Sequence, residues 1–157
     1  MKKKFWLLVE CVLLPLFVGG LSGVLIREGV KGYADMPKPP LSPPAIVFPI
    51  VWGILYLLMG IGSYLVLTSG GTKEEIKKAT SVYIWQLLAN FLWPTFFFNF
   101  QWYLFSFFWL LLLWVLVLVM LVRFNCVSKV ATYLNIPYLI WLTFAAYLNL
   151  GVYLMSR

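Results

Sequence analysis

The fold is decided by residues 38–67, which read KPPLSPPAIVFPIVWGILYLLMGIGSYLVL. Prolines crowd the start of this stretch, and they lead directly into an uninterrupted apolar segment, Ile46–Leu67. Such a segment is long enough to cross a hydrocarbon core of about 30 Å, which takes about 20 helical residues. A proline cluster in front of it can simply mark a loop, or it can form a stiff cover beside something that the helices hold.

The composition of the whole chain points to lipid as its main solvent. The chain has 157 residues, of which 63% are hydrophobic and 11% charged. A soluble domain has about a quarter of its residues charged. The polar surface is too small to coat a water-soluble globule, and the length indicates a single domain over residues 1–157.

Five stretches are long and apolar enough to span a membrane. None alternates in the way of a membrane β-strand, and helices are the other form whose backbone groups are satisfied within lipid. The sequence therefore predicts an all-α membrane protein, a five-transmembrane helix bundle. The predicted spans are about Phe5–Ile26, Ile46–Leu67, Ala79–Phe98, Tyr103–Val122 and Ala131–Tyr153.

The N-terminal segment resembles a signal peptide, because lysines precede an apolar run. The run is too long, however, and no A-x-A-like cleavage site follows it, so we keep it as the first span. Its Gly19-x-x-x-Gly23 spacing favours close helix packing, either within one chain or between two. Because the basic extension is limited to Lys2–Lys4, we expect a bacterial plasma membrane.

Lys and Arg residues predict the orientation. With five spans, eight of them share a side with the N-terminus and four lie on the other, which places the N-terminus in the cytoplasm and the 27–45 loop outside. The net charge of +7 fits this anchoring. It does not indicate nucleic-acid binding, since no soluble domain presents a basic face. The eight are Lys2, Lys3, Lys4, Lys73, Lys77, Lys78, Arg123 and Lys129.

The residue inventory argues against conventional catalytic and metal chemistry. The chain has no histidine, which removes the commonest general base and metal ligand. Its two cysteines, Cys11 and Cys126, are far apart and neither belongs to a CxxC pair, so we expect no disulfide, no metal site and no cofactor. Glu10 is a lone acid near one membrane edge, whose role the sequence leaves open.

Three of the predicted helices carry aromatic and amide side chains on one face. Amides in membrane helices face the bundle interior, so these faces predict a pocket for a flat apolar ligand with few polar contacts. The alternative is that these side chains serve only ordinary packing and hydrogen bonding between helices. The three sets are Phe48, Trp52, Tyr56 and Met59; Gln86, Asn90, Trp93 and Phe97; and Tyr138, Trp141, Ala145 and Asn149.

Three blocks carry a resemblance to a known family. They are KPPLSPPAIVFPIVWGILYLLMGIGSYLV at 38–66, WQLLANFLWPTFFF at 85–98 and PYLIWLTFAAYLNL at 137–150. Together they resemble the TspO/MBR family of translocator proteins and peripheral-type benzodiazepine receptors, over essentially the whole chain. The resemblance implies a five-helix membrane bundle, commonly a homodimer, with a pocket beneath the loop between the first two spans. The 27–45 loop is then a lid.

The ligands that the resemblance implies are porphyrins such as protoporphyrin IX, sterols, and synthetic isoquinoline carboxamides and benzodiazepines. We therefore expect a receptor that binds tetrapyrroles in a regulatory or porphyrin-handling role. The positions matching the family's pocket are Trp52, Asn90, Trp141, Ala145 and Leu148. The face argument adds Tyr33, Phe48, Tyr56, Gln86 and Phe91.

Two further functions and one motif stay open. A light-driven porphyrin-degrading enzyme would have to use the excited porphyrin and oxygen, with Trp52 and Trp141 as electron donors. A porphyrin or sterol transporter is less well supported, because no inverted repeat is visible. Leu150, Tyr153 and Arg157 fit a loose cholesterol-recognition pattern, for which membrane anchoring of the helix end is the simpler interpretation.

Overall fold

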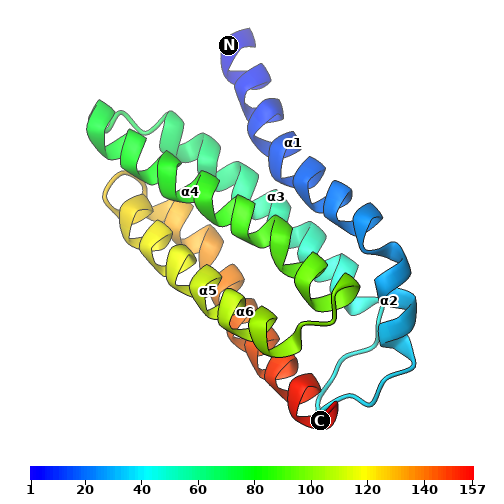
Figure 1. Cartoon of the computed structure of the whole chain (residues 1–157). Coiled ribbons are helices and arrows are strands. Elements are labelled where there is room, and N and C mark those ends of the chain that lie inside the picture. Colours follow the sequence, from blue (N-terminus) through cyan, green and yellow to red (C-terminus); the bar gives the residue numbers. More distant parts are fainter.

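The chain forms a bundle of antiparallel and parallel helices without any strand, so the all-α prediction is confirmed. The computed structural model describes all residues from 1 to 157. Figure 1 shows long helices lying side by side, with the two termini at opposite ends of the bundle. The helices are α1 (Lys2–Leu25), α2 (Arg27–Ala34), α3 (Val47–Leu67), α4 (Lys73–Pro94), α5 (Tyr103–Asn125) and α6 (Lys129–Met155), with a π-helical turn, η1 (Thr95–Asn99), after α4.

Four of the helices, α1, α3, α5 and α6, are long and apolar enough to cross a membrane. α5 shows why lipid must surround them. Its inward side chains, such as Leu113 and Val117, are buried, while Phe108 and Val122 are each 59% exposed on the outward side. An apolar surface this continuous is incompatible with water, and the protein is therefore an integral membrane protein.

The remaining predicted span, Ala79–Phe98, lies within α4 and η1, although α4 begins six residues earlier, at Lys73, and is less apolar than the other four helices. It opens with KEEIKK, and the amides Gln86 and Asn90 lie in its buried half. A capping box starts the helix: the backbone N–H of Glu75 donates to the Thr72 hydroxyl at 3.1 Å, and the N–H of Thr72 donates to the Glu75 carboxylate at 3.3 Å. Sequence and structure thus agree on a helix here.

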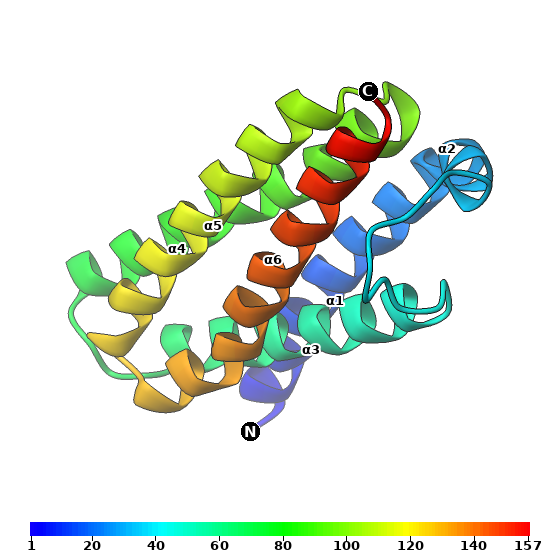
Figure 2. The same cartoon turned by 90° about the horizontal axis from the view of Figure 1, so that it is seen from below.

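The 27–45 loop contains a helix that sequence reasoning did not predict. Residues 27–34 form α2, and the irregular proline-rich chain begins only after it. A short linking helix is locally favoured because Glu28 and Lys31 form an ion pair one turn apart, at 3.1 Å. Figures 1 and 2 place α2 at the end of the bundle where the C-terminus lies.

A close backbone contact joins α1 to α3 at Gly60. A methyl group on Gly60 would lie 2.6 Å from the Cα of Val12 and 2.7 Å from the carbonyl oxygen of Cys11. Small residues permit such backbone contact in membrane bundles. The predicted small-residue pair of α1 behaves differently, because Gly19 faces the ring of Tyr56 whereas Gly23 has open space around it.

We predict that Gly60→Ala destabilises the protein by about 1–3 kcal/mol, because the added methyl meets backbone atoms that cannot rotate away. Gly53→Ala is the matched control on the same helix, since nothing lies within 4 Å of a methyl there. Alanine favours helix formation over glycine by about 1 kcal/mol, so the control should be neutral or stabilising. Thermal unfolding in nanodiscs measures both; equal midpoints for the two variants would contradict the contact.

Candidate functional site

A chain of buried hydrogen bonds joins three of the predicted site residues to Tyr138. The Tyr56 hydroxyl of α3 donates to the Asn90 side-chain oxygen of α4 at 2.7 Å. The Asn90 amide donates to the Tyr138 hydroxyl of α6 at 2.7 Å, and that hydroxyl donates to the Gln86 side-chain oxygen at 2.7 Å. All four side chains are buried, so the chain ties α3, α4 and α6 together at the bundle centre.

Aromatic rings continue from this chain toward the loop end of the bundle. Trp52 stacks on Tyr56 with ring centroids 5.6 Å apart and meets Tyr138 edge-on at 6.2 Å. Phe48 meets Trp141 edge-on at 5.9 Å. Phe48, Trp52 and Trp141 are half-buried, so their ring faces form one partly accessible wall contributed by α3 and α6.

The indole N–H of Trp141 is buried and has no hydrogen-bond partner. Such a donor costs free energy unless an acceptor meets it. Ala145 lies one turn further along α6 and is 7% exposed, and Leu148 follows at 6%. Because Ala145 is small, no bulky side chain from the next turn of α6 lies beside the Trp141 indole.

A second polar link lies closer to the loop end. The Trp93 indole N–H donates to the Asn149 side-chain oxygen at 3.1 Å, and the Asn149 amide donates to the Tyr103 carbonyl oxygen at 2.8 Å. This link joins α4, α6 and α5. Trp93 also stacks on Phe97 of η1, with ring centroids 5.2 Å apart.

Tyr33 of α2 covers the end of this aromatic set. Its ring meets Phe97 at 5.6 Å and Phe98 at 5.3 Å, and the Lys38 ammonium lies 4.9 Å from its centroid. Burial raises the pKa of the Tyr33 phenol above its ordinary value, and the nearby Tyr103 phenol adds to the rise. The hydroxyl is therefore neutral at physiological pH.

The proline-rich segment 35–46 is attached to the C-terminal half of α6. The Tyr147 hydroxyl donates to the Pro40 carbonyl oxygen at 2.7 Å. Pro39 is buried, and its ring occupies the space where a side chain at Gly151 would lie. Near the start of the segment, the Tyr103 hydroxyl donates to the Met36 sulfur at 3.0 Å. The segment is thus held across the bundle end rather than extending into solvent.

Nine of the ten predicted site residues lie in or beside these networks, and Phe91 stands apart. No aromatic contact links Phe91 to the others, and its carbonyl oxygen accepts from Ser22 of α1 at 3.4 Å. Sequence reasoning placed Tyr138 on the inward face but left it out of the site, although it is the member that joins both amides of α4. The sequence signal for including Tyr138 in the site was its position three residues before Trp141, on the same face of the helix.

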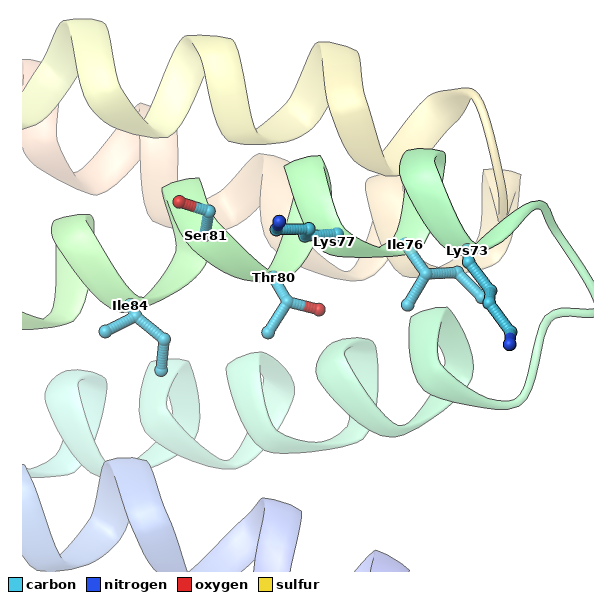
Figure 3. Close-up of a pocket in the computed structure, with 6 residues that line it drawn as sticks. All are labelled: Lys73, Ile76, Lys77, Thr80, Ser81 and Ile84. Carbon is cyan, nitrogen blue, oxygen red and sulfur yellow. The ribbon is translucent and has the colours of Figure 1, made fainter.

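Three hollows of the surface lie elsewhere. One lies along the outer side of α4, where Figure 3 shows Ile76, Thr80 and Ile84 beside α3 and two lysines at the helix start. A second lies between α1, α3 and α4, and a third, polar one lies beside Thr72 and Arg123. None of the three is lined by a predicted site residue.

Comparison with known proteins places this arrangement in a family. The family model described as "TspO/MBR family" matches residues 11–154. The chain belongs to the TspO/MBR family. It is 34% identical over 153 residues to "Tryptophan-rich protein TspO" of Chlorobaculum tepidum, covering 97% of each chain. It is 39% identical over 143 residues to "Translocator protein" of Ovis aries, covering 90% of this chain and 85% of that one.

A third relative carries a name that describes a role. The chain is 31% identical over 128 residues to "Tryptophan-rich sensory protein" of Cereibacter sphaeroides, covering 82% of this chain and 78% of that one. Membership of the TspO/MBR family is thus shared with bacterial and animal proteins. The family resemblance seen in the three sequence blocks is confirmed.

We predict that Tyr138→Phe lowers the free energy of unfolding by about 1–3 kcal/mol, because it leaves two buried amides without their shared hydroxyl. Tyr133→Phe is the matched control on α6, since its side chain is 64% exposed and its hydroxyl makes no hydrogen bond. Chemical unfolding in mixed micelles measures both variants. Equal stability of the two variants would mean that the chain of hydrogen bonds does not hold the helices.

Proposed function

We propose that this protein is a membrane receptor that binds tetrapyrroles such as protoporphyrin IX between α3, α4 and α6. The observation that carries the proposal is the unpartnered indole N–H of Trp141 beside the small Ala145. A ligand acceptor at this point satisfies a donor that the folded chain leaves buried. The bound ligand serves a regulatory or porphyrin-handling role, in keeping with the sensory name of one relative.

The aromatic wall suits a flat apolar ligand. Phe48, Trp52 and Trp141 offer ring faces and edges with which a macrocycle can stack, a geometry worth about 0.5–1.5 kcal/mol for each aromatic pair beyond burial. Only a few polar groups interrupt the wall, which is the usual composition of small-molecule sites. Synthetic isoquinoline carboxamides and benzodiazepines share this flat, weakly polar character, so we expect them to compete for the same space; sterols are a less well-matched class.

Cationic side chains gather at the same end of the bundle. Arg27 is exposed there and has no carboxylate partner, and the Lys38 ammonium donates only to backbone carbonyl oxygens, of Ala34 at 3.0 Å and Met36 at 3.2 Å. The propionates of a porphyrin are the complementary groups, because ion-assisted hydrogen bonds to carboxylates are among the strongest. The ligand therefore enters with its carboxylates toward this end.

We also propose that α4 with η1 is a fifth membrane span. α4 packs directly on α5 and reaches α1 and α3, all three of which are apolar enough to span. Its 22 residues give a length of about 33 Å, enough for the hydrocarbon core. Its lysines then share the cytoplasmic side with Lys2–Lys4, and the receptor works in the plasma membrane as a homodimer.

We predict that Ala145→Leu lowers the affinity for protoporphyrin IX by at least about tenfold, or about 1.4 kcal/mol. The larger side chain takes the space beside the Trp141 indole without removing any hydrogen bond. Tryptophan quenching in nanodiscs measures the affinity, and thermal unfolding without ligand checks that the bundle stays intact.

Ile140→Phe serves as the control for that experiment, because Ile140 is 65% exposed on the outer face of the same helix. It enlarges a side chain as well but should bind porphyrin normally. Normal binding by Ala145→Leu would place the ligand elsewhere, and absence of saturable quenching in the unmodified protein would refute the proposed function altogether.

We predict that Tyr147→Phe increases the dissociation rate of bound porphyrin severalfold. The substitution removes the hydrogen bond that holds Pro40 over the bundle end, so the 35–46 segment opens more often. Stopped-flow displacement by excess competitor measures this rate. Tyr153→Phe, one to two turns later and without a side-chain hydrogen bond, should leave the rate unchanged; identical rates in both variants would argue against a covering role for the segment.

A further inference from the structure

A separate hollow lies at the opposite end of the bundle from the proline-rich segment. It has a volume of about 200 Å³ and lies between α1, α3 and α4, with Phe124 of α5 at its edge. Leu7, Glu10 and Leu14 line it from α1 at the spacing of one helix face. A dry apolar cavity of about 150 Å³ is enough to bind benzene. The hollow therefore has room for the body of a small amphiphile.

The hollow lies just beyond the level at which the backbones of α1 and α3 meet. Their backbones meet at Gly60, and one turn further along α3 comes the small side chain of Ser63. The Ser63 hydroxyl donates to the Gly60 carbonyl oxygen of its own helix at 2.9 Å, and it lies near the Cys11 thiol and the Tyr83 hydroxyl. In Figure 1 the N-terminal end of α1 stands apart from the start of α4.

Inside the hollow, the Tyr83 hydroxyl is buried near the Ser63 hydroxyl, which is already bonded to Gly60, and no partner lies within hydrogen-bond distance of it. The residue as a whole is only 3% exposed. Buried hydroxyls in folded proteins are nearly always hydrogen-bonded, because an unpartnered one loses its hydration without compensation. This group therefore marks a point where a polar atom of a ligand is expected.

At the mouth of the same hollow, Glu10 is an acid without a cationic partner. It is the one acidic residue within α1, α3, α5 and α6, and neither ion pair of the protein includes it. An ionisable group in a membrane-spanning segment is costly and normally pairs with an opposite charge. The nearest basic side chains along the chain, Lys2–Lys4, do not supply that partner in the structure.

We propose that this hollow is a second ligand site, which binds an apolar amine with its ammonium between the Glu10 carboxylate and the Tyr83 hydroxyl. The ammonium donates to both oxygens, and the apolar body lies against Leu7, Leu14 and Phe124. A carboxylate ligand is rejected by the charge of Glu10. The amine can be a free amphiphile or the headgroup of an aminophospholipid, since both present the same N–H donors.

Equilibrium dialysis of radiolabelled octylamine tests the proposal, with the protein in phosphatidylcholine nanodiscs and empty nanodiscs as the partition blank. We expect one saturable site per chain. Glu10→Gln keeps the shape but removes the charge and should weaken binding about tenfold or more. Tyr83→Phe removes only the hydroxyl and should weaken it severalfold, whereas Ala145→Leu at the other end should have no effect.

Cys11 lines the same hollow and locates the bound amine. In a Cys126→Ser background it is the only thiol, and octylamine should slow its modification by dithiodipyridine saturably, while octanoate should not. Replacing part of the phosphatidylcholine by phosphatidylethanolamine distinguishes the two sources: competition with octylamine assigns the site to the lipid headgroup, and its absence assigns it to a free amine.

The proposal is overturned if octylamine shows no saturable binding beyond the empty nanodiscs. It is also overturned if Glu10→Gln and Tyr83→Phe both bind as tightly as the unmodified protein, or if octanoate protects Cys11 as well as octylamine does. Porphyrin binding at the other end is independent of each of these results.

Discussion

The hydrogen-bond chain through Tyr138 is the interaction on which the rest of the bundle depends. In lipid, apolar side chains gain little by leaving the solvent, so helices are held by close packing and by polar contacts between them. Tyr138 of α6 accepts from Asn90 and donates to Gln86, and Tyr56 of α3 completes the connection. This single chain fixes the rotation of three helices about their axes, because each side chain can reach its partner from only one face.

That fixed rotation determines where the aromatic rings lie. Tyr56 and Asn90 face inward. Trp52, which lies one turn before Tyr56 on α3, therefore stacks on the Tyr56 ring. On α6, Trp141 follows Tyr138 by three residues and turns toward Phe48. The half-buried aromatic wall is therefore a consequence of the polar chain beneath it. Every side chain of the polar chain has its partners, with the Gln86 amide nitrogen donating to the Met59 sulfur at 3.9 Å, whereas the Trp141 indole N–H above it has none.

The two ends of the bundle differ in how they are closed. At the C-terminal end, α2, η1 and the 35–46 segment cover the helices, with Pro39 packed at Gly151 and Pro40 bonded to Tyr147. At the N-terminal end no segment covers the space between α1 and α4, and the small Ser63 leaves it unfilled. The same bundle thus presents a covered aromatic region at one end and an open hollow with an unpaired acid at the other.

The sequence by itself determined that lipid is the main solvent of the protein, where its helices lie along the chain, and which helix faces turn inward. Apolar runs of membrane length predicted the four apolar helices within about three residues at each end, because length and hydropathy are local properties, whereas the polar first turn of α4, from Lys73, was left out of its predicted span. Helical spacing also put Asn90, Tyr138 and Trp141 on inward faces. Only the tertiary structure decided that Tyr138 links Gln86 and Asn90, residues 52 and 48 positions away, and that Gly60 rather than Gly23 makes the close contact. Periodicity shows which face of a helix turns inward. It shows neither how deeply a residue on that face is buried nor which residue it contacts, because both depend on how segments distant in the chain pack together.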